Sequence, residues 1–430
     1  MSNHDPASCR QRRRVAALFC LVATAMCHMG VMAPSRAIFA IHAQSSVIQY
    51  VAGAANRDGY VGDAACLPCH REKSLTYRHT SHHLTSQMPD RTSILGSFEP
   101  PNNMLTIADP KDNDQYPRLY FEMGEKDSSY YQTAVAEQAG KRLTHKERID
   151  LVIGSAARGQ TYLFWSGNEL YELPVSYWKE SNQWINSPGY KDGTANFERH
   201  VDPRCLECHS TFIHPLSADP QTNVYKRESL VLGISCESCH GPGTSHIAVE
   251  QSNSAKVQRL SDAGILNPTR LSRDRQVDQC ALCHNGTERA EIAPAFSYVP
   301  GQPLDKYLGA NPADISDDPD VHGNQVGLLK KSRCYLLTPT MSCSTCHDVH
   351  APERTAATYS DRCLSCHQWQ SCGAARRLGK KIKQNCVECH MPQMQTSAIV
   401  SITAGRILRT SIRTHWIKVY PEAAAQLELH

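Results

Sequence analysis

The stretch "CESCHGPGTSH" (residues 236–246) decides the fold, because it joins a Cys-x-x-Cys-His motif to a Gly-Pro-Gly bend and a second histidine. A histidine directly after such a cysteine pair marks the attachment site of a c-type haem. The thiols of Cys236 and Cys239 add to the haem vinyl groups, and the imidazole of His240 becomes the proximal iron ligand. The motif itself leaves no role for His246.

The same motif occurs seven times in 430 residues, whereas the cysteine and histidine content predicts about 0.04 copies by chance. A structural zinc site would not require a histidine after every second cysteine. A thiol redox pair would occur once, within a βαβ pattern. The sequence therefore predicts seven covalently bound haem c groups. They are held by Cys66, Cys69 and His70; Cys205, Cys208 and His209; Cys236, Cys239 and His240; Cys280, Cys283 and His284; Cys343, Cys346 and His347; Cys363, Cys366 and His367; and Cys386, Cys389 and His390.

Residues 1–43 have the pattern of a signal peptide. A basic segment, "RQRRR" (10–14), precedes the apolar run "VAALFCLVATAMC" (15–27), and small residues near 37–43 mark the expected cleavage region. An uncleaved anchor is the alternative, but this run is shorter than the roughly 20 residues of a bilayer span. We therefore expect an exported, periplasmic bacterial protein, because haem is attached outside the cytoplasm. We expect no stable membrane span after signal removal.

The charge balance argues against nucleic acid as a partner, since the formal net charge is only +3 and haem propionates would make the protein more acidic. We expect other redox proteins, or quinone-linked electron donors and acceptors, as partners. The hydrophobic content of 40% is modest for a chain of this length. Porphyrins packed inside the protein would supply much of the missing core.

Motif spacing predicts two parts that pack as one unit. The part formed by residues 44–204 holds the first haem site, and residues 205–430 hold six sites whose first cysteines are 31, 44, 63, 20 and 23 residues apart. So little chain per haem predicts a mainly α, haem-packed fold with much irregular loop. A small β-hairpin is expected in "QTYLFWSGNELYELPVSYW" (160–178). The segment "AGKRLTHKERIDLVIG" (139–154) begins with helix-favouring residues and ends with a strand-like run.

The remaining histidines are expected to supply sixth iron ligands. The attachment loop stays on the proximal face of its own haem, so His246 and His350, a few residues beyond their motifs, would bind the iron of a neighbouring haem. His79, His82 and His83 share one helical face, so at most one or two of them bind iron. His145, His200 and His430 are expected at the surface, and the role of His214 stays open. Methionine is the competing ligand, but Met391 directly follows a proximal histidine and cannot cross the ring.

Two cysteines remain outside both the leader and the motifs, Cys334 and Cys372. In an oxidising compartment they would form a disulfide, or they are two unpaired buried thiols. The spacing of the sequence leaves both alternatives open.

Several pieces of this chain carry a family resemblance: "CLPCH…TSHH", "CLECHST", "CESCHGPGTSH", "VHGNQV…SRC", "CSTCHDVH", "CVECHMP" and "THWI". They cover most of residues 60–420 and resemble bacterial multihaem cytochromes of the cytochrome c-552/c-554 type, related to hydroxylamine oxidoreductase and pentahaem nitrite reductase. The resemblance implies a largely helical fold with stacked and perpendicular haem pairs. It also implies the distal ligands His83 (or His82), His246, His322, His350 and His415.

The chain departs from its enzymatic relatives in two places. It lacks the Cys-x-x-Cys-Lys site of the nitrite reductases, and no tyrosine can be matched to the haem cross-link of hydroxylamine oxidoreductase. We therefore expect an electron-transfer protein, a heptahaem cytochrome with mostly bis-histidine haems. The alternative is a redox enzyme that acts on a small nitrogen or sulfur compound at one five-coordinate haem. No catalytic residue can be named from the sequence.

Overall fold

The computed structural model describes residues 59–109, 117–252, 264–286, 289–310, 324–352 and 355–426. All of them belong to one compact unit, Ile48–His430. The predicted signal peptide and His430 lie outside the described residues. No helix of the described ranges is both long and apolar enough to cross a bilayer.

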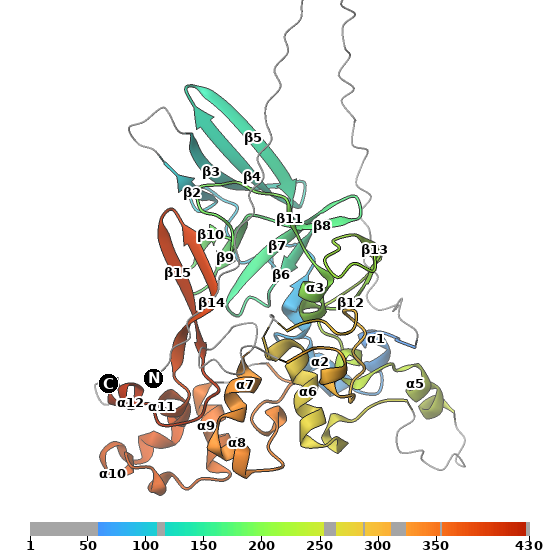
Figure 1. Ribbon diagram of the computed structural model, residues 1–430, viewed down its shortest axis with the longest axis vertical. Coiled ribbons are helices and arrows are strands. Elements are labelled where there is room, and N and C mark those ends of the chain that lie inside the picture. Colours follow the sequence, from blue (N-terminus) through green and yellow to red (C-terminus); the bar gives the residue numbers. More distant parts are fainter. Residues whose placement is uncertain are drawn as a thin grey trace, which may run out of the picture. The chain divides into compact units, whose positions relative to one another are not determined.

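The first sheet is a four-stranded antiparallel meander in the order β2-β3-β4-β5 (Figure 1). Its strands are β2 (Met104–Ala108), β3 (Arg118–Lys126), β4 (Ser129–Gln138) and β5 (Lys141–Arg148). Asp127 and Ser128 join β3 to β4, and Ala139 and Gly140 join β4 to β5; all four residues have positive φ. Two-residue turns of this kind match the right-handed twist of paired strands.

The second sheet contains the predicted hairpin. Strands β7 (Gly159–Ser166) and β8 (Glu169–Glu172) pair across a tight turn, and β9 (Val175–Trp178) pairs with both β7 and β10 (Gln183–Asn186). The sheet is completed by β1 (Ser86–Gln87), β6 (Leu151–Ile153) and β11 (Arg199–His200). Two separate hairpins follow, β12 (Ser210–Pro215) with β13 (Tyr225–Leu232), and β14 (Gln393–Thr403) with β15 (Arg406–Arg413).

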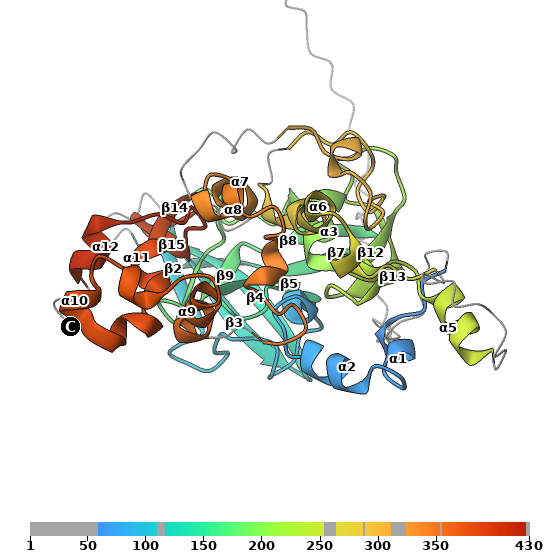
Figure 2. The same ribbon diagram turned by 90° about the horizontal axis from the view of Figure 1, so that it is seen from below.

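The helices are short (Figure 2). Most of them contain or adjoin a haem motif. The α-helices are α1 (Asp63–Cys66), α2 (Arg71–Tyr77), α3 (Pro203–His209), α4 (Glu237–His240), α5 (Thr244–Gln251), α6 (Arg273–His284), α7 (Gln325–Lys330), α8 (Arg333–Leu337), α9 (Ala356–Leu364), α10 (Ala375–Leu378), α11 (Cys386–His390) and α12 (Pro421–Gln426). The 3₁₀ turns are η1 (His83–Thr85), η2 (Pro268–Arg270), η3 (Leu304–Lys306), η5 (Cys343–Thr345), η6 (Trp369–Ser371) and η7 (Gly379–Gln384).

The prediction of a mainly α fold is not confirmed, because helices and strands each take up 29% of the described residues. The segment 139–154 begins with residues that favour helices, but Lys141–Arg148 form strand β5. This strand pairs with β4 along its whole length. Helix propensity is a weak preference that tertiary pairing overrides. The predicted hairpin of residues 160–178 is present, as part of a larger sheet.

The apolar core is concentrated around the two sheets. One cluster joins Phe121, Met123, Tyr162 and Leu173, all with no exposed surface, to aromatic residues such as Trp184. A second lies between the second sheet and α3, and a third packs α6 against α7 and α8. Aromatic residues of the hairpin contribute in two ways, because Tyr177 belongs to the first cluster and also lines the cavity described next.

Candidate haem-binding cavity

Each attachment motif folds as one helical turn. The backbone N–H of the motif histidine donates to the carbonyl of the first cysteine, at 2.9 Å from His70 to Cys66 and 3.0 Å from His240 to Cys236. The same bond closes the fifth and sixth motifs. In a helical turn, residues i and i+3 lie on one face. Both cysteines of a motif therefore face the same way, as attachment to two vinyl groups of one porphyrin requires.

The motifs open into a single continuous cavity of about 3260 Å³. All 21 cysteines and histidines of the seven motifs line it, as do His82, His246, His350 and His415. An ordinary small-molecule pocket measures about 300–1,000 Å³. A space of this size, lined at seven places by the haem-attachment residues, fits several porphyrins packed together.

Cysteines of different motifs meet inside this cavity. Each contact is a thiol–thiol hydrogen bond, which places the attachment points of two haems side by side. The fourth motif touches two others through its two cysteines. The pairs are Cys66 with Cys236, Cys208 with Cys283, Cys280 with Cys343, and Cys363 with Cys386.

Four pairs of histidine rings face each other at closely similar distances. An imidazole nitrogen binds a metal at about 2.0–2.1 Å, and the ring centre lies roughly 1 Å behind it. Two imidazoles on opposite sides of one iron therefore have ring centroids about 6 Å apart. The observed centroid distances and interplanar angles are 6.3 Å and 24° for His70 and His246, 6.1 Å and 26° for His240 and His350, 6.2 Å and 23° for His347 and His415, and 6.0 Å and 79° for His82 and His284.

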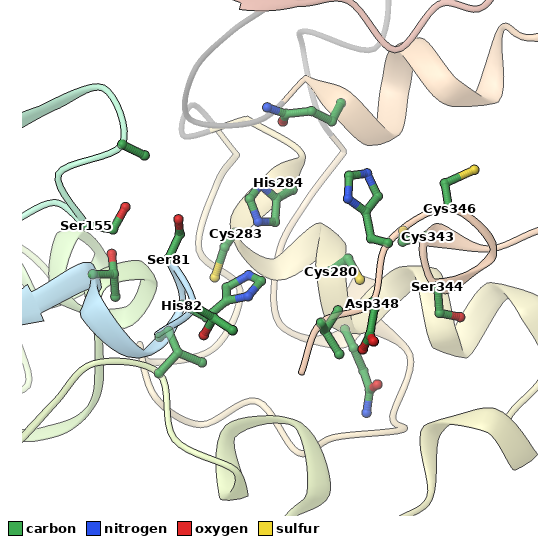
Figure 3. A pocket seen from close by; sticks show the side chains of 18 of the residues that line it. Ser81, His82, Ser155, Cys280, Cys283, His284, Cys343, Ser344, Cys346 and Asp348 are labelled. Carbon is green, nitrogen blue, oxygen red and sulfur yellow. The ribbon is translucent and has the colours of Figure 1, made fainter. Parts of the chain in front are cut away.

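The structure distinguishes His82 from His83. Figure 3 shows His82 and His284 reaching into the pocket from separate elements, the segment before β1 and helix α6. His83 instead faces Asp63, with 3.6 Å between Nδ1 and the carboxylate, and packs edge-on against Tyr77. Gly233, at φ +66°, holds this segment, because a Cβ there would lie 2.1 Å from the His83 carbonyl oxygen. The next residue, Ile234, donates its N–H to the His82 carbonyl at 3.0 Å.

Comparison with known proteins finds similarity to multihaem cytochromes. A family model described as cytochrome c554 and c-prime matches residues 163–241, which contain the second and third motifs. The C-type polyheme cytochrome OmcC of Geobacter sulfurreducens is 25% identical over 177 residues, and the multiheme cytochrome MtrA of Shewanella baltica is 26% identical over 194 residues. The chain is a multihaem c-type cytochrome.

The likeness to these relatives is partial. The alignment with OmcC covers 36% of this cytochrome and 21% of the relative, and that with MtrA covers 41% and 56%. The cytochrome thus spans between about a fifth and just over half of the length of the relatives it matches. No solved structure matches.

The protonation of several cavity histidines suits metal binding. Burial lowers the pKa of His284 and of His415 to about 4, so both are neutral at pH 7. His240 Nδ1 lies 2.7 Å from the Leu266 carbonyl, and His390 Nδ1 lies 2.9 Å from the Lys418 carbonyl. A carbonyl can only accept, so Nδ1 carries the proton and Nε2 presents its lone pair to the cavity.

The other histidines named in the sequence have different surroundings. His322 lies outside the described residues. His145 is exposed and lies 2.9 Å from Glu147, and His214 is exposed on β12. His200 stands at the cavity wall with its ring against Tyr171. His79 is exposed after α2.

The two remaining cysteines do not form a disulfide in this structure. Cys334 and Cys372 are free thiols, and both line the cavity. Of the two alternatives that the sequence left open, the structure contains the unpaired thiols.

Sequence reasoning missed the acidic residues inside the motifs. Glu237 is 2% exposed, and its carboxylate accepts the N–H groups of Val61, Gly62 and Gly243 at 2.8–2.9 Å. This carboxylate ties the first attachment loop to the third. The signal available in the sequence was a glutamate between the two cysteines of a haem motif. A carboxylate buried at such a place needs hydrogen-bond donors from elsewhere in the chain.

The second and seventh motifs use the same device. Glu207 accepts the Phe296 N–H at 2.6 Å and pairs with Arg204, which also donates to the Leu282 carbonyl inside the fourth motif. In the seventh motif Glu388 binds Arg413 of β15 at 2.9 Å.

Proposed function

We propose that this cytochrome relays single electrons along seven covalently bound haem c groups. The observation that carries the proposal is the one cavity lined by all seven motifs, with attachment cysteines of different motifs in contact. When bound, each haem iron changes between the ferric and ferrous states and so holds one electron. The likeness to a polyheme and a multiheme cytochrome supports the same function.

The polypeptide would hold four of the irons between two histidines each. The facing rings support His70 with His246, His240 with His350, His284 with His82, and His347 with His415 as axial pairs. In this scheme His246 and His350 serve neighbouring haems, and His82, rather than His83, is the ligand. His322 stays a candidate for one of the remaining three sites. Bis-histidine ligation gives a haem iron a lower reduction potential than histidine–methionine ligation does.

Contacts between residues in or beside the motifs indicate which sites are neighbours. The first site adjoins the third, and the third adjoins the fourth, where the Gln279 side chain donates to the Cys239 carbonyl at 3.0 Å. The fourth adjoins both the second and the fifth. The fifth adjoins the sixth, because the His347 ring packs against Tyr359 of α9, the helix that carries Cys363. The sixth adjoins the seventh through Cys363 and Cys386. The fourth site is therefore the junction, and the second site is a branch.

The predicted signal peptide supports a cellular setting outside the cytoplasm. We place the cytochrome outside the cytoplasm, in the periplasm or exported beyond it, with redox proteins or quinone-linked carriers as donors and acceptors. The relationship to hydroxylamine oxidoreductase and pentahaem nitrite reductase stays a prediction.

The junction gives the sharpest test of the relay. Removing the fourth site by Cys280→Ser, Cys283→Ser and His284→Ala should slow electron equilibration after flash reduction, because this site connects three others. The matched control removes the branch by Cys205→Ser, Cys208→Ser and His209→Ala. It should lower the electron capacity from seven to six without slowing equilibration. Equal effects of the two variants, or a wild type that accepts fewer than seven electrons, would contradict the proposal.

The ligand assignment is tested at two adjacent residues. His82→Ala should convert one haem from low-spin to high-spin, seen as a new ferric signal in electron paramagnetic resonance. His83→Ala is the matched control and should leave the spin states unchanged. The reverse outcome would give the iron to His83. A high-spin haem in the wild type that binds nitrite or hydroxylamine would favour the enzyme.

A further inference from the structure

The positive charge of the cytochrome is concentrated in one stretch of the chain. Residues 368–420 contain nine basic residues and one acidic residue, a formal charge of +8. The whole chain sums to +3, so the rest of it carries −5. The basic stretch begins after the sixth motif and includes the seventh. The basic residues are Arg376, Arg377, Lys380, Lys381, Lys383, Arg406, Arg409, Arg413 and Lys418.

Three of these cations form an exposed surface on α10 and η7, which we call the basic face: Arg376, Lys380 and Lys381. Gly379, at φ +59°, makes the turn that joins α10 to η7. No Asp or Glu occurs between residues 368 and 385. Within the described ranges, none of the three cations forms an ion pair. The basic face therefore presents its charge to solvent.

Haem propionates do not account for the basic face. Arg362 and Arg377 line the cavity, so the carboxylates of a bound porphyrin could reach them. Arg376, Lys380 and Lys381 are not part of the cavity lining. Arg376 and Arg377 are adjacent in the chain, and only the second of them lines the cavity.

The basic face covers the sixth and seventh attachment sites. Ile382, next to Lys381, is 5% exposed and lines the cavity, and its carbonyl accepts the Cys386 thiol at 3.7 Å. Cys386 in turn contacts Cys363 of the sixth motif. Helices α9, α10 and α11 lie close together in both views (Figures 1 and 2). One turn of η7 thus separates the exposed charge from the last two attachment sites.

We propose that the basic face is the docking surface for an acidic electron-transfer protein, which exchanges one electron at a time with the cytochrome through the sixth and seventh sites. This inference rests on the proposed relay. In each exchange the reduced partner loses one electron and the oxidised partner gains it, so no further reactant is needed. Complementary charge steers encounter and can raise association rates by about 10–10³-fold.

A protein fits this surface better than a lipid bilayer. Surface helices that bind anionic membranes combine their Lys and Arg residues with an exposed apolar anchor. The basic face has no such anchor, because its nearest apolar residues, Leu378 and Ile382, are half-buried and buried.

The test compares two triple charge reversals. Arg376→Glu, Lys380→Glu and Lys381→Glu together invert the basic face. The matched control is Lys126→Glu, Lys141→Glu and Lys191→Glu, three exposed lysines elsewhere on the chain. The probe is a reduced flavodoxin, an acidic one-electron protein, mixed with the oxidised cytochrome in a stopped-flow instrument at low salt. The basic-face variant should be reduced at least tenfold more slowly than the wild type, and the control within twofold of it.

High salt and a neutral donor complete the design. The difference between the two variants should vanish in high salt, because screening removes the steering. Reduced lumiflavin, a small neutral donor, should fill all haems of both variants at the wild-type rate. If lumiflavin cannot fill the wild type, the relay itself is wrong.

Other outcomes would overturn the docking proposal alone. If the lumiflavin results hold and the two variants react equally with flavodoxin, the basic face is not the docking surface. A loss that persists in high salt would contradict an electrostatic contact. Binding to phosphatidylserine vesicles that disappears in the basic-face variant, with an unchanged flavodoxin rate, would assign the surface to a membrane.

Discussion

The region of the two sheets and the C-terminal haem region obtain their cores in different ways. In the sheets, side chains such as Phe121, Met123 and Tyr162 have no exposed surface. Between residues 336 and 426, the buried hydrophobic side chains of the described residues are only Ile382 and Val387. Three of the seven motifs lie in that second stretch. The sheets therefore carry their own apolar core, whereas the haem region needs its porphyrins to fill the cavity.

This difference explains how a chain with 40% hydrophobic residues can fold. Burial of apolar surface is the main favourable contribution to folding, at roughly 25 cal/mol per Å². Short helices such as α10 and α11 bury almost nothing by themselves, and short isolated helices are marginal in water. A porphyrin against each motif would supply the missing apolar contact.

The largest expected effect comes from removing the haems. Protein produced without haem attachment should keep slow hydrogen exchange in β3, β4 and β7, because their core lies within the protein. Amides of α9, α10 and α11 should exchange freely. Mass-spectrometric hydrogen exchange, compared with the holoprotein, measures both regions in one sample. Equal protection of the two regions in the haem-free protein would mean that the C-terminal region does not depend on haem for its core.

Truncating a core side chain in the sheets should loosen the sheets and leave the haem region intact. Phe121→Ala should destabilise the sheet region by about 3–5 kcal/mol, since it leaves a cavity in a closely packed cluster. Exchange in β3 and β4 should accelerate while the Soret band of the haems stays unchanged. Leu143→Ala in the same sheet is the control, because Leu143 is 73% exposed. Loss of the Soret band in the Phe121 variant would mean that the haem region depends on the core of the sheets.

A smaller effect is expected where polypeptide contacts join two haem loops. Glu237→Gln replaces an acceptor of three N–H groups by an amide and should cost about 1–3 kcal/mol. Exchange should increase at residues 59–66, which the carboxylate holds. The exposed Glu198→Gln is the matched change and should be neutral. Unchanged exchange at 59–66 would mean that the bound haems alone hold this loop.

The sequence predicts the positions of the haem sites but not the neighbours of each site. The seven motifs are local signals, since one helical turn places both cysteines and the histidine. Contacts such as Cys208 with Cys283 join residues far apart in the chain, and nothing in the motif spacing specifies them. The same holds for Glu237, whose donors lie about 175 residues away or across a bend.

The choice between His82 and His83 also lay beyond the sequence. The two are adjacent, and the turn at η1 decides which ring enters the cavity. That turn is fixed by Gly233 and Ile234 from the end of β13. Strand β5 was missed because it is built from residues that favour helices and gains its structure from pairing with β4.

The smallest expected effect is a pH dependence in the second sheet. Burial raises the pKa of Glu172 from 4.5 to about 7, although Arg199 lies 3.2 Å away. A carboxyl whose pKa is raised by folding stabilises the fold below its unfolded value, and this contribution is lost as pH rises through the folded value. The free energy of unfolding should therefore fall by about 1–3 kcal/mol between pH 4.5 and 7.5. Glu172→Gln should flatten this slope in denaturant titrations, and the exposed Glu169→Gln should leave it. If the free energy of unfolding still falls with pH in the Glu172 variant, another group causes the pH dependence.

We expect this polypeptide to carry a haem at every motif, all within one shared cavity. The intact mass of the mature protein, measured under denaturing conditions, reports the number of haems, because thioether bonds survive unfolding. We expect the mass of the processed chain plus seven haem groups. A fully matured sample that carries fewer than seven, or none, would contradict it.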